Sequence, residues 1–271
     1  VIGGGISGLF SALSFNKKKP NARIAILERD IFPNGASTKN AGFACFGSIS
    51  ELIEDSIKMS ELSLLNLVEK RVRGLELLKK TISQKNLDLI NNGGYELFFT
   101  QNQNLERSIE KYNKLLFPIF NKNIFSLKNE KIESLGFSKK IVKQLIFNPF
   151  EAQINTGTTI YELQKLANQK GIKIITGANV ENFDLNSFDH EIHVSNFNSK
   201  ISFKSKYLAI CSNAFTKQWF PDYDINPGRG MVLITKPIKN LKLKGCFHYN
   251  KGYYYFRDFQ NRVLFGGGRQ L

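Results

Sequence analysis

Short apolar runs alternate with amphipathic segments at the start of this 271-residue chain. Residues 1–2 end one apolar strand, residues 9–15 continue as an apolar helix, and residues 23–27 form a second apolar run. Runs of this length are typical of parallel strands that are buried on both faces. The pattern therefore predicts a strand–turn–helix–strand unit.

The turn of this unit is a glycine pattern, Gly3-Gly4-Gly5-Ile6-Ser7-Gly8. The spacing of Gly3, Gly5 and Gly8 is that of a dinucleotide-binding motif. Gly3 makes the tight turn, Gly5 lets a pyrophosphate approach the backbone, and Gly8 lets the helix pack on the strand. The N-terminus of the helix offers free N–H groups to the phosphates. A glycine turn in another α/β fold is the alternative interpretation.

An acidic residue ends the second apolar run. Glu28 lies 20 residues after Gly8, where an acid accepts hydrogen bonds from the adenosine ribose. Its charge disfavours the 2′-phosphate of NADP. At this stage NAD and FAD remain open, and a solvated strand end is the alternative for Glu28.

The remaining pattern divides into helices, strands and one irregular stretch. Periodicities of three to four residues predict helices over 50–80, 105–116 and 158–169, and residues 117–150 are expected to be irregular with short helical pieces. Apolar or alternating runs predict strands over 95–100, 172–176 and 207–211, an antiparallel meander at 191–194 and 201–203, and sheet strands at 227–234, 252–257 and 261–267.

Composition and charge change this picture little. The hydrophobic content of 42% is normal for a globular protein, and no apolar run is long enough to cross a membrane. The formal net charge of +15 comes mostly from lysines spread along the chain, which favours a solvated surface over an anionic partner. Three scattered cysteines and three histidines show no disulfide framework and no metal spacing. We expect a cytoplasmic protein, with a peripheral membrane location as the alternative.

A second loop makes the cofactor prediction more specific. Leu27-Glu28-Arg29 ends the strand, and Gly35-Ala36-Ser37-Thr38-Lys39-Asn40-Ala41-Gly42 follows it. Together with the glycine turn, these stretches resemble the FAD-dependent oxidoreductases of the D-amino-acid oxidase/glycine oxidase superfamily. In that superfamily the second loop reaches from the pyrophosphate to the flavin ring, so the resemblance implies FAD.

The resemblance also implies site residues. Ser37 and Thr38 would lie near the phosphates, Asn40, Ala41 and Gly42 near the flavin, and Val180 would contact adenine through its backbone. Cofactor contacts are thus expected at Gly3, Gly5, Ile6, Ser7, Gly8, Glu28, Arg29, Ser37, Thr38, Asn40, Ala41, Gly42, Val180, Asn213 and Ala214. For the substrate we expect Tyr254 and Arg257, then Arg229, because an arginine can pair with a carboxylate. The alternative is that these three residues lie on the sheet surface or between the domains.

The fold implied is α/β, with a Rossmann-like FAD-binding domain interleaved with a substrate domain that holds a mixed or antiparallel sheet and helices. We expect the FAD domain at 1–47 and 151–217, and the substrate domain at 48–150 and 218–271. Both ends look cut, and a C-terminal FAD-domain segment is expected to be missing. This chain alone is therefore expected to bind FAD poorly.

The function implied is oxidation of a C–N bond in an amine or amino acid, with O2 or a membrane or quinone carrier as electron acceptor. Hydride passes to flavin N5 and the imine product is then hydrolysed. Two alternatives remain open: a flavin-dependent enzyme that modifies uridine in tRNA, supported only by the net charge, and a non-catalytic FAD-binding protein.

Overall fold

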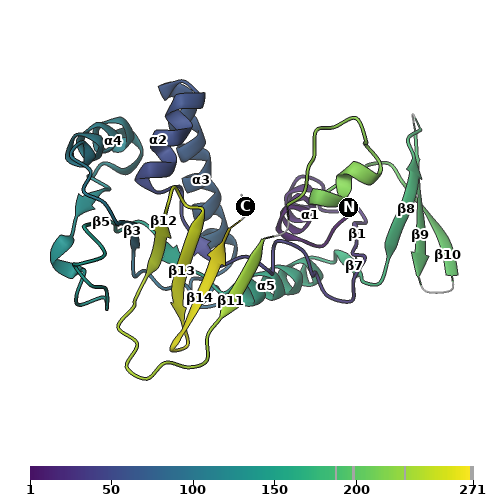
Figure 1. Cartoon of the computed structure of the whole chain (residues 1–271). Coiled ribbons are helices and arrows are strands. Elements are labelled where there is room, and N and C mark those ends of the chain that lie inside the picture. The colour runs from purple at the N-terminus through teal and green to yellow at the C-terminus, as the bar shows by residue number, and fades with distance from the viewer. Residues whose placement is uncertain (187, 197–198, 229, 269–271) are drawn as a thin grey trace. The chain divides into compact units, whose positions relative to one another are not determined.

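The computed structural model describes residues 1–186, 188–196, 199–228 and 230–268. It is a mixed α/β structure that separates into two compact units (Figure 1). Unit 1 comprises Val1–Asn40 and Thr156–Gly228, and unit 2 comprises Ala41–Asn155 and Arg229–Leu271. The domain boundaries expected from the sequence differ from these by several residues and stay a prediction. Within the described residues, no helix is both long and apolar enough to span a bilayer.

Unit 1 is built on short parallel pairings. Strand β1 (Ala25–Leu27) pairs with β7 (Lys173–Ile175), and Ile2 bridges in parallel to Leu27 on one side and to Ile210 on the other. Helices α1 (Ile6–Lys18) and α5 (Thr156–Gln169) pack together, each with a buried apolar stripe. The chain thus runs strand, glycine turn, helix and strand, as the sequence predicts.

An antiparallel meander completes unit 1 (Figure 1). Strands β8 (Asn179–Asp184), β9 (His190–Asn196) and β10 (Ser199–Ser205) lie in the order β10–β9–β8. The predicted meander is confirmed. Of the strand predicted at 207–211, only the part around Ile210 pairs: Ile210 bridges in parallel to Ile2, and the Ile2 N–H and the Cys211 N–H form the two flanking hydrogen bonds. Tyr207 is 58% exposed, and its ring lies 5.2 Å from that of Phe15. A short 3-10 helix, η2 (Asn213–Gln218), follows.

Unit 2 contains a seven-stranded sheet. Its order is β11–β14–β13–β12–β3–β5–β4, and only the β12–β3 pairing is parallel. The strands are β3 (Gly94–Phe98), β4 (Ser126–Leu127), β5 (Gln144–Asn148), β11 (Met231–Ile234), β12 (Cys246–Tyr249), β13 (Tyr254–Phe259) and β14 (Arg262–Gly267). A separate two-stranded antiparallel sheet is formed by β2 (Phe43–Ala44) and β6 (Ala152–Gln153).

One central strand contradicts the sequence prediction. Residues 117–150 were expected to be irregular, yet β5 pairs with β3 on one side and β4 on the other. Its residues Leu145 and Ile146 are almost fully buried on opposite faces of the sheet. A strand buried on both faces has no alternation, so its five residues carry no period-two signal.

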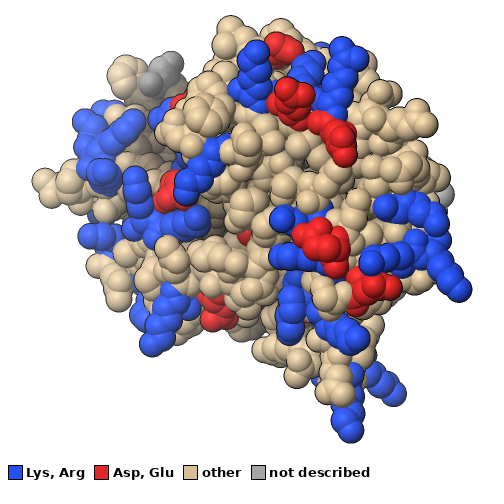
Figure 2. Space-filling model, turned by 90° about the vertical axis from the view of Figure 1, so that its left-hand side faces the viewer, with Lys and Arg blue, Asp and Glu red and all other residues tan. Residues whose placement is uncertain are grey.

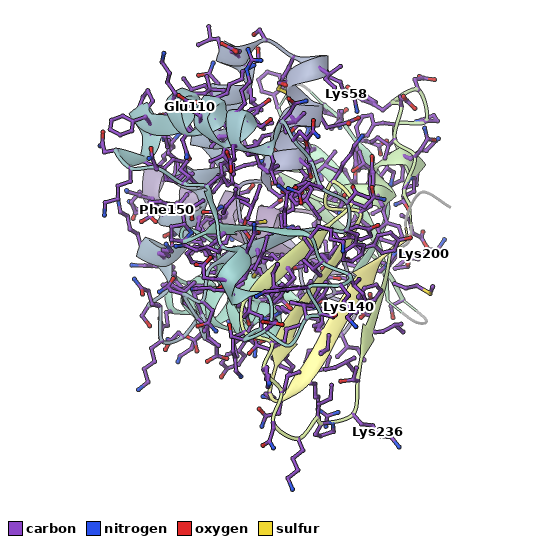
Figure 3. All side chains as sticks on the ribbon, turned by 60° about the vertical axis from the view of Figure 1, so that its left-hand side comes forward. Lys58, Glu110, Lys140, Phe150, Lys200 and Lys236 are labelled. Carbon is purple, nitrogen blue, oxygen red and sulfur yellow. The ribbon has the colours of Figure 1, made fainter. Side chains whose placement is uncertain are left out.

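Three helices cover the β5 end of the sheet (Figure 1): α2 (Ile49–Lys58), α3 (Glu61–Thr81) and α4 (Leu105–Phe120). The predicted helical stretch at 50–80 divides where Ser60 starts α3 and accepts a hydrogen bond from the Ser63 N–H. Leu52, Leu64 and Leu116 form the common core, with none of their surface exposed. A 3-10 turn, η1 (Asn129–Lys131), precedes β5. In Figure 3 the side chain of Lys236, beyond β11, points away from this core.

Asn113 fixes the segment that follows α4. Its side chain is 7% exposed; it accepts the N–H groups of Ile124 and Phe125 at 2.8 Å and donates to the Phe125 carbonyl at 2.9 Å. Asn113→Leu should lower the free energy of unfolding by about 2–3 kcal/mol, because it leaves buried backbone groups without partners. Denaturant unfolding measures this. Asn123→Leu, at an exposed position, is the control, and an equal loss in both variants would contradict the assigned role.

The two faces of the sheet differ in chemistry. Phe247 and Phe256 stack at 5.0 Å with rings 4° from parallel, and Tyr95 stacks on Phe247 at 5.1 Å, so one face is apolar. The opposite face carries buried polar side chains from the alternate positions: Glu96, Asn148, His248 and Arg257.

Candidate functional site

The glycine turn of unit 1 is closed against neighbouring backbone. Gly3 has φ +103°, and a Cβ there would lie 2.5 Å from the carbonyl oxygen of Cys211. A Cβ on Gly8 would overlap the carbonyl oxygen of Gly3. A Cβ on Gly5 would lie 2.9 Å from Ser37 Oγ. Gly3 and Gly8 are therefore required by their close approach to backbone, whereas Gly5 approaches only the side chain of Ser37.

The N-terminus of α1 is open to an anion. Gly5 is the N-cap and makes no side-chain capping bond, and the first turn contains no acidic residue. The Ile6 N–H donates to Ser37 Oγ at 3.0 Å, so the second loop reaches the start of this helix. The positive end of the helix dipole thus lies beside the Ser37 hydroxyl. The first turn of the helix supplies no carboxylate that would neutralise it.

Glu28 is fixed at the end of β1. Its Oε2 accepts the Gly4 N–H at 2.7 Å, and its Oε1 accepts the Asp30 N–H at 3.2 Å. Each carboxylate oxygen keeps a free lone-pair direction for a further donor, such as a ribose hydroxyl. The neighbouring Arg29 stacks on Phe215, with its guanidinium carbon 4.0 Å from the ring centre.

Two polar side chains of the second loop form hydrogen bonds to the backbone of the loop itself. Thr38 Oγ1 donates to the carbonyls of Pro33 and Gly35, and Asn40 Nδ2 donates to Ala36 and Ser37. These bonds shape the loop, so Thr38 and Asn40 position it. Whether they also contact a cofactor stays a prediction.

Three further predicted residues lie in unit 1. Asn213 and Ala214 start η2, just after the Cys211 carbonyl that packs on Gly3, and Asn213 has a positive φ of 49°. Val180 is 4% exposed, and its side chain lies in the apolar cluster with Val194. Its carbonyl accepts Gln218 Nε2 at 3.5 Å. The adenine contact of Val180 stays a prediction.

In unit 2, Ala41 is buried and Gly42 has φ +72°. A Cβ on Gly42 would overlap the Ile154 carbonyl oxygen and lie 3.0 Å from Arg257 Nη2. A glycine at position 42 thus leaves room for the Ile154 carbonyl and for the Arg257 side chain.

Tyr254 and Arg257, two of the expected substrate residues, are not brought together. In the β12–β13 register, Tyr255 and Arg257 share the polar face, whereas Tyr254 is on the apolar face and stacks on Tyr249 at 5.9 Å. Tyr254 and Arg257 therefore point to opposite sides of the sheet. Arg229 lies outside the described residues.

Comparison with protein families identifies the family of the chain that carries this turn and loop. A sequence model of the FAD-dependent oxidoreductases known as DAO matches residues 1–271. The chain belongs to this family. Comparison with curated protein sequences gives no match. The cofactor of the family is FAD.

Solved structures show the DAO fold. L-amino acid deaminase from Proteus myxofaciens is 14% identical, with a TM-score of 0.72. The match covers 98% of this chain and 57% of the deaminase chain. Glycine oxidase from Geobacillus kaustophilus is 18% identical with a TM-score of 0.70 over 98% of this chain and 71% of that one. L-proline dehydrogenase from P. horikoshii is 18% identical with a TM-score of 0.66 over 99% of this chain and 70% of that one. The chain thus spans less than two thirds of the deaminase and about seven tenths of the other two.

The residues of unit 1 fit FAD. The turn is free of side chains at Gly3, Gly5 and Gly8, the helix N-terminus carries no acid, and Glu28 is oriented by two backbone donors. These are the features that a pyrophosphate and an unphosphorylated ribose require.

A buried ion pair in this DAO protein was not predicted from the sequence. His248 Nε2 lies 2.8 Å from Glu151 Oε2, with side-chain exposures of 6% and 1%. Asn148 Nδ2 donates to the other oxygen of Glu151 at 3.3 Å. The acid that pairs with His248 lies 97 residues away along the chain, so no local pattern predicts the pair.

This pair changes the pKa of its histidine. Burial alone lowers the pKa of His248, but the charge and hydrogen bond of Glu151 raise it from 6.5 to about 9. Glu96, on the adjacent strand position, accepts hydrogen bonds from the Ser50 hydroxyl and N–H. Burial raises the pKa of Glu96 despite these bonds. His248 is therefore held as a cation beside Glu151 at neutral pH.

Basic side chains do not gather in one patch on the face drawn in Figure 2. Lysines and arginines lie around its periphery with acids among them. Several form exposed pairs, such as Lys139 with Glu133 at 3.0 Å.

Proposed function

We propose that this protein oxidises the C–N bond of an amine or amino acid, using FAD bound at the glycine turn of unit 1. The observation that carries the proposal is the family match over the whole chain, together with a side-chain-free turn at a helix N-terminus. Three proteins of similar fold are named for reactions of amino acids, which supports this substrate class.

The chain's own residues have separate tasks in this proposal. Gly3, Gly5 and Gly8 admit the pyrophosphate to the N–H groups of α1, and Glu28 accepts hydrogen bonds from the ribose. Ser37 and Thr38 would contact the phosphates, and Asn40, Ala41 and Gly42 would contact the flavin ring. Bound FAD supplies a two-electron acceptor for the hydride on the carbon next to nitrogen. Water then hydrolyses the imine of the substrate to a carbonyl compound and an amine or ammonia.

Anaerobic mixing tests the proposed reaction. The protein reconstituted with FAD is mixed with glycine, sarcosine, D-amino acids, proline and polyamines, and the flavin absorbance is recorded. We expect at least one class to bleach the flavin. Glycolate and lactate, which replace the nitrogen of glycine and alanine by oxygen, should leave it oxidised. Failure of every amine, or equal reduction by the hydroxy acids, would contradict C–N oxidation.

Glu28 offers a test of the cofactor site. Glu28→Ala should weaken FAD binding about tenfold or more, because hydrogen bonds to a charged group contribute about 1.5–3 kcal/mol. Flavin fluorescence titration measures the dissociation constant. Asp30→Ala removes a neighbouring exposed acid and is the matched control. Equal affinities of the two variants would remove Glu28 from the site.

A further inference from the structure

The small sheet of β2 and β6 continues directly from the second loop. Gly42 is the last residue of that loop, and Phe43, which follows it, pairs with Gln153 of β6. The Ile154 N–H donates to the Gly42 carbonyl at 2.9 Å. All of these residues belong to unit 2. The backbone of residues 153–154 therefore determines where the end of the second loop lies.

Arg257 of β13 holds this backbone from the polar face of the seven-stranded sheet. Its Nη1 donates to Gln153 Oε1 at 3.1 Å, and its Nη2 donates to the Ile154 carbonyl at 3.2 Å. One guanidinium thus binds two consecutive residues. Arg257 is 5% exposed, and its guanidinium carbon lies 5.4 Å from the centre of the Phe259 ring. Both terminal nitrogens of its planar fork are therefore held in place.

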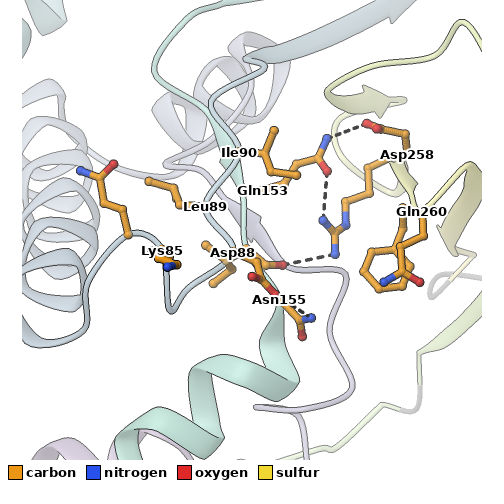
Figure 4. Close-up of a pocket in the computed structure, with 12 residues that line it drawn as sticks. Lys85, Asp88, Leu89, Ile90, Gln153, Asn155, Asp258 and Gln260 are labelled. Atoms are coloured by element: carbon orange, nitrogen blue, oxygen red, sulfur yellow. Dashed lines mark hydrogen bonds between the residues drawn. The ribbon is translucent and has the colours of Figure 1, made fainter.

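Asp258 completes the hold on the Gln153 side chain. Gln153 Nε2 donates to Asp258 Oδ1 at 2.8 Å, so both ends of the Gln153 amide bind neighbouring residues of β13. Figure 4, which draws the pocket that these residues line, shows both hydrogen bonds. Gln153 is 1% exposed, and Asp258 also accepts the Gly245 N–H at 3.0 Å. Because burial strengthens such bonds, they define one orientation of the Gln153 side chain.

The ring of Phe43 packs on the same polar face. It meets the His248 ring edge-on at 5.2 Å and the Tyr255 ring at 5.8 Å. His248 and Tyr255 lie opposite each other on β12 and β13. The end of the second loop is thus held by its backbone, through Arg257, and by the next side chain, through these two rings.

The contact between the loop and Arg257 leaves no spare space. Gly42 has φ +72°, and a Cβ there would overlap the Ile154 carbonyl oxygen and lie 3.0 Å from Arg257 Nη2. Close-packed interiors transmit displacements, because they contain few voids that could absorb them. A shift of the guanidinium or of the Ile154 carbonyl therefore shifts Gly42.

We propose that Arg257 is a positioning residue for the flavin, because it fixes the Gly42 end of the second loop through Gln153 and Ile154. The proposal rests on the proposed FAD site, in which Asn40, Ala41 and Gly42 contact the ring. Groups that contact a reacting centre must be held within about 0.5 Å by locked neighbouring side chains. Arg257 provides this support with a rigid fork, which the single ammonium of a lysine does not reproduce.

Hydrogen exchange of the whole chain without FAD tests the hold on the loop. Mass spectrometry of peptides compares the unaltered protein with Arg257→Lys, which keeps the charge and loses the fork. We expect exchange in residues 41–44 and 152–154 to become at least about tenfold faster, and exchange in β3 and β5 to stay unchanged. Arg262→Lys on the neighbouring strand β14 is the matched control, because Arg262 Nη1 also donates to a carbonyl, that of Thr235, at 3.0 Å. It should leave residues 41–44 and 152–154 unchanged.

Visible circular dichroism of the FAD-loaded protein tests the effect on the flavin. This signal reports the asymmetric surroundings of the ring and requires no reaction with an amine. We expect Arg257→Lys to change it and Arg262→Lys to leave it unchanged. The affinity of Arg257→Lys for FAD should fall by no more than about threefold, because the proposed phosphate and ribose contacts lie in unit 1.

Two results in Arg257→Lys would overturn the proposal: uniformly faster exchange across unit 2, and a loosened loop with an unchanged flavin signal. Where Arg257→Lys does not fold, Gly42→Ala decides, because its added Cβ displaces the Ile154 carbonyl from the loop side. Unchanged exchange at residues 152–154 in Gly42→Ala would overturn the proposal as well. If loop and flavin signal both change but no amine reduces the flavin, the positioning role stands and the proposed oxidation fails.

Discussion

Gly8→Ala is expected to lower the free energy of unfolding by about 2–3 kcal/mol and to abolish FAD binding. The added Cβ would overlap the carbonyl oxygen of Gly3 and lie 3.1 Å from its carbonyl carbon. Both partners are backbone, so no side-chain rotation relieves the overlap, and overpacking of this kind costs about 1–3 kcal/mol. The turn must then move away from α1, which removes the geometry that admits a phosphate.

Gly35→Ala is the matched control for this variant. A Cβ on Gly35 meets no atom within 4 Å, and Gly35 lies in the second loop of the same unit. Denaturant unfolding and flavin fluorescence should show Gly35→Ala close to the unaltered protein. A stable Gly8→Ala protein with unchanged affinity for FAD would contradict the close packing of strand and helix.

Glu151→Ala is expected to destabilise unit 2 by about 3–5 kcal/mol, because it leaves the buried His248 without its counterion. It also removes the acceptor for Asn148 Nδ2. The control is Glu133→Ala, which breaks an exposed pair with Lys139 and should change stability by less than about 1 kcal/mol. Chemical denaturation of both variants at pH 6 measures the difference, and equal losses would contradict the importance of burial.

The same pair makes stability depend on pH. The folded-state pKa of His248, about 9, is above its ordinary value of 6.5, so its contribution is complete below pH 6.5 and is lost as pH rises through 9. The shift corresponds to a contribution on the order of 3 kcal/mol. Glu96 acts in the same direction, because its folded-state pKa is also raised.

Unfolding at a series of pH values between 6 and 10 tests this dependence. The unaltered protein should lose stability across the range, and Glu151→Gln should show a much smaller change, since its amide no longer raises the pKa of His248. Equal slopes in the two proteins would assign the pH dependence to other groups.

The glycine turn and its parallel strand could be predicted from sequence because each is a local pattern. Gly8 meets the backbone of Gly3 within the same motif, and Glu28 follows at a fixed spacing. The helices of unit 2 were predictable for the same reason, since their apolar residues recur at helical spacing.

Features that depend on distant pairing were not predictable. β5 carries no alternation because both its faces are buried, and the partner of His248 lies far away along the chain. The sequence shows that Tyr254 and Arg257 are three positions apart, and strand geometry then places them on opposite faces. Which face is polar follows only from the register with β12, where Arg257 pairs with Cys246 and Tyr254 with Tyr249.

The central claim is that FAD bound to this chain accepts electrons from a C–N bond. The most direct test is an anaerobic titration of the FAD-reconstituted protein with the amine that reduces it, with the carbonyl product quantified by mass spectrometry. The account predicts one equivalent of carbonyl product for each flavin reduced, and none from the matching hydroxy acid. Flavin that stays oxidised with every amine, or that is reduced without a carbonyl product, would contradict it.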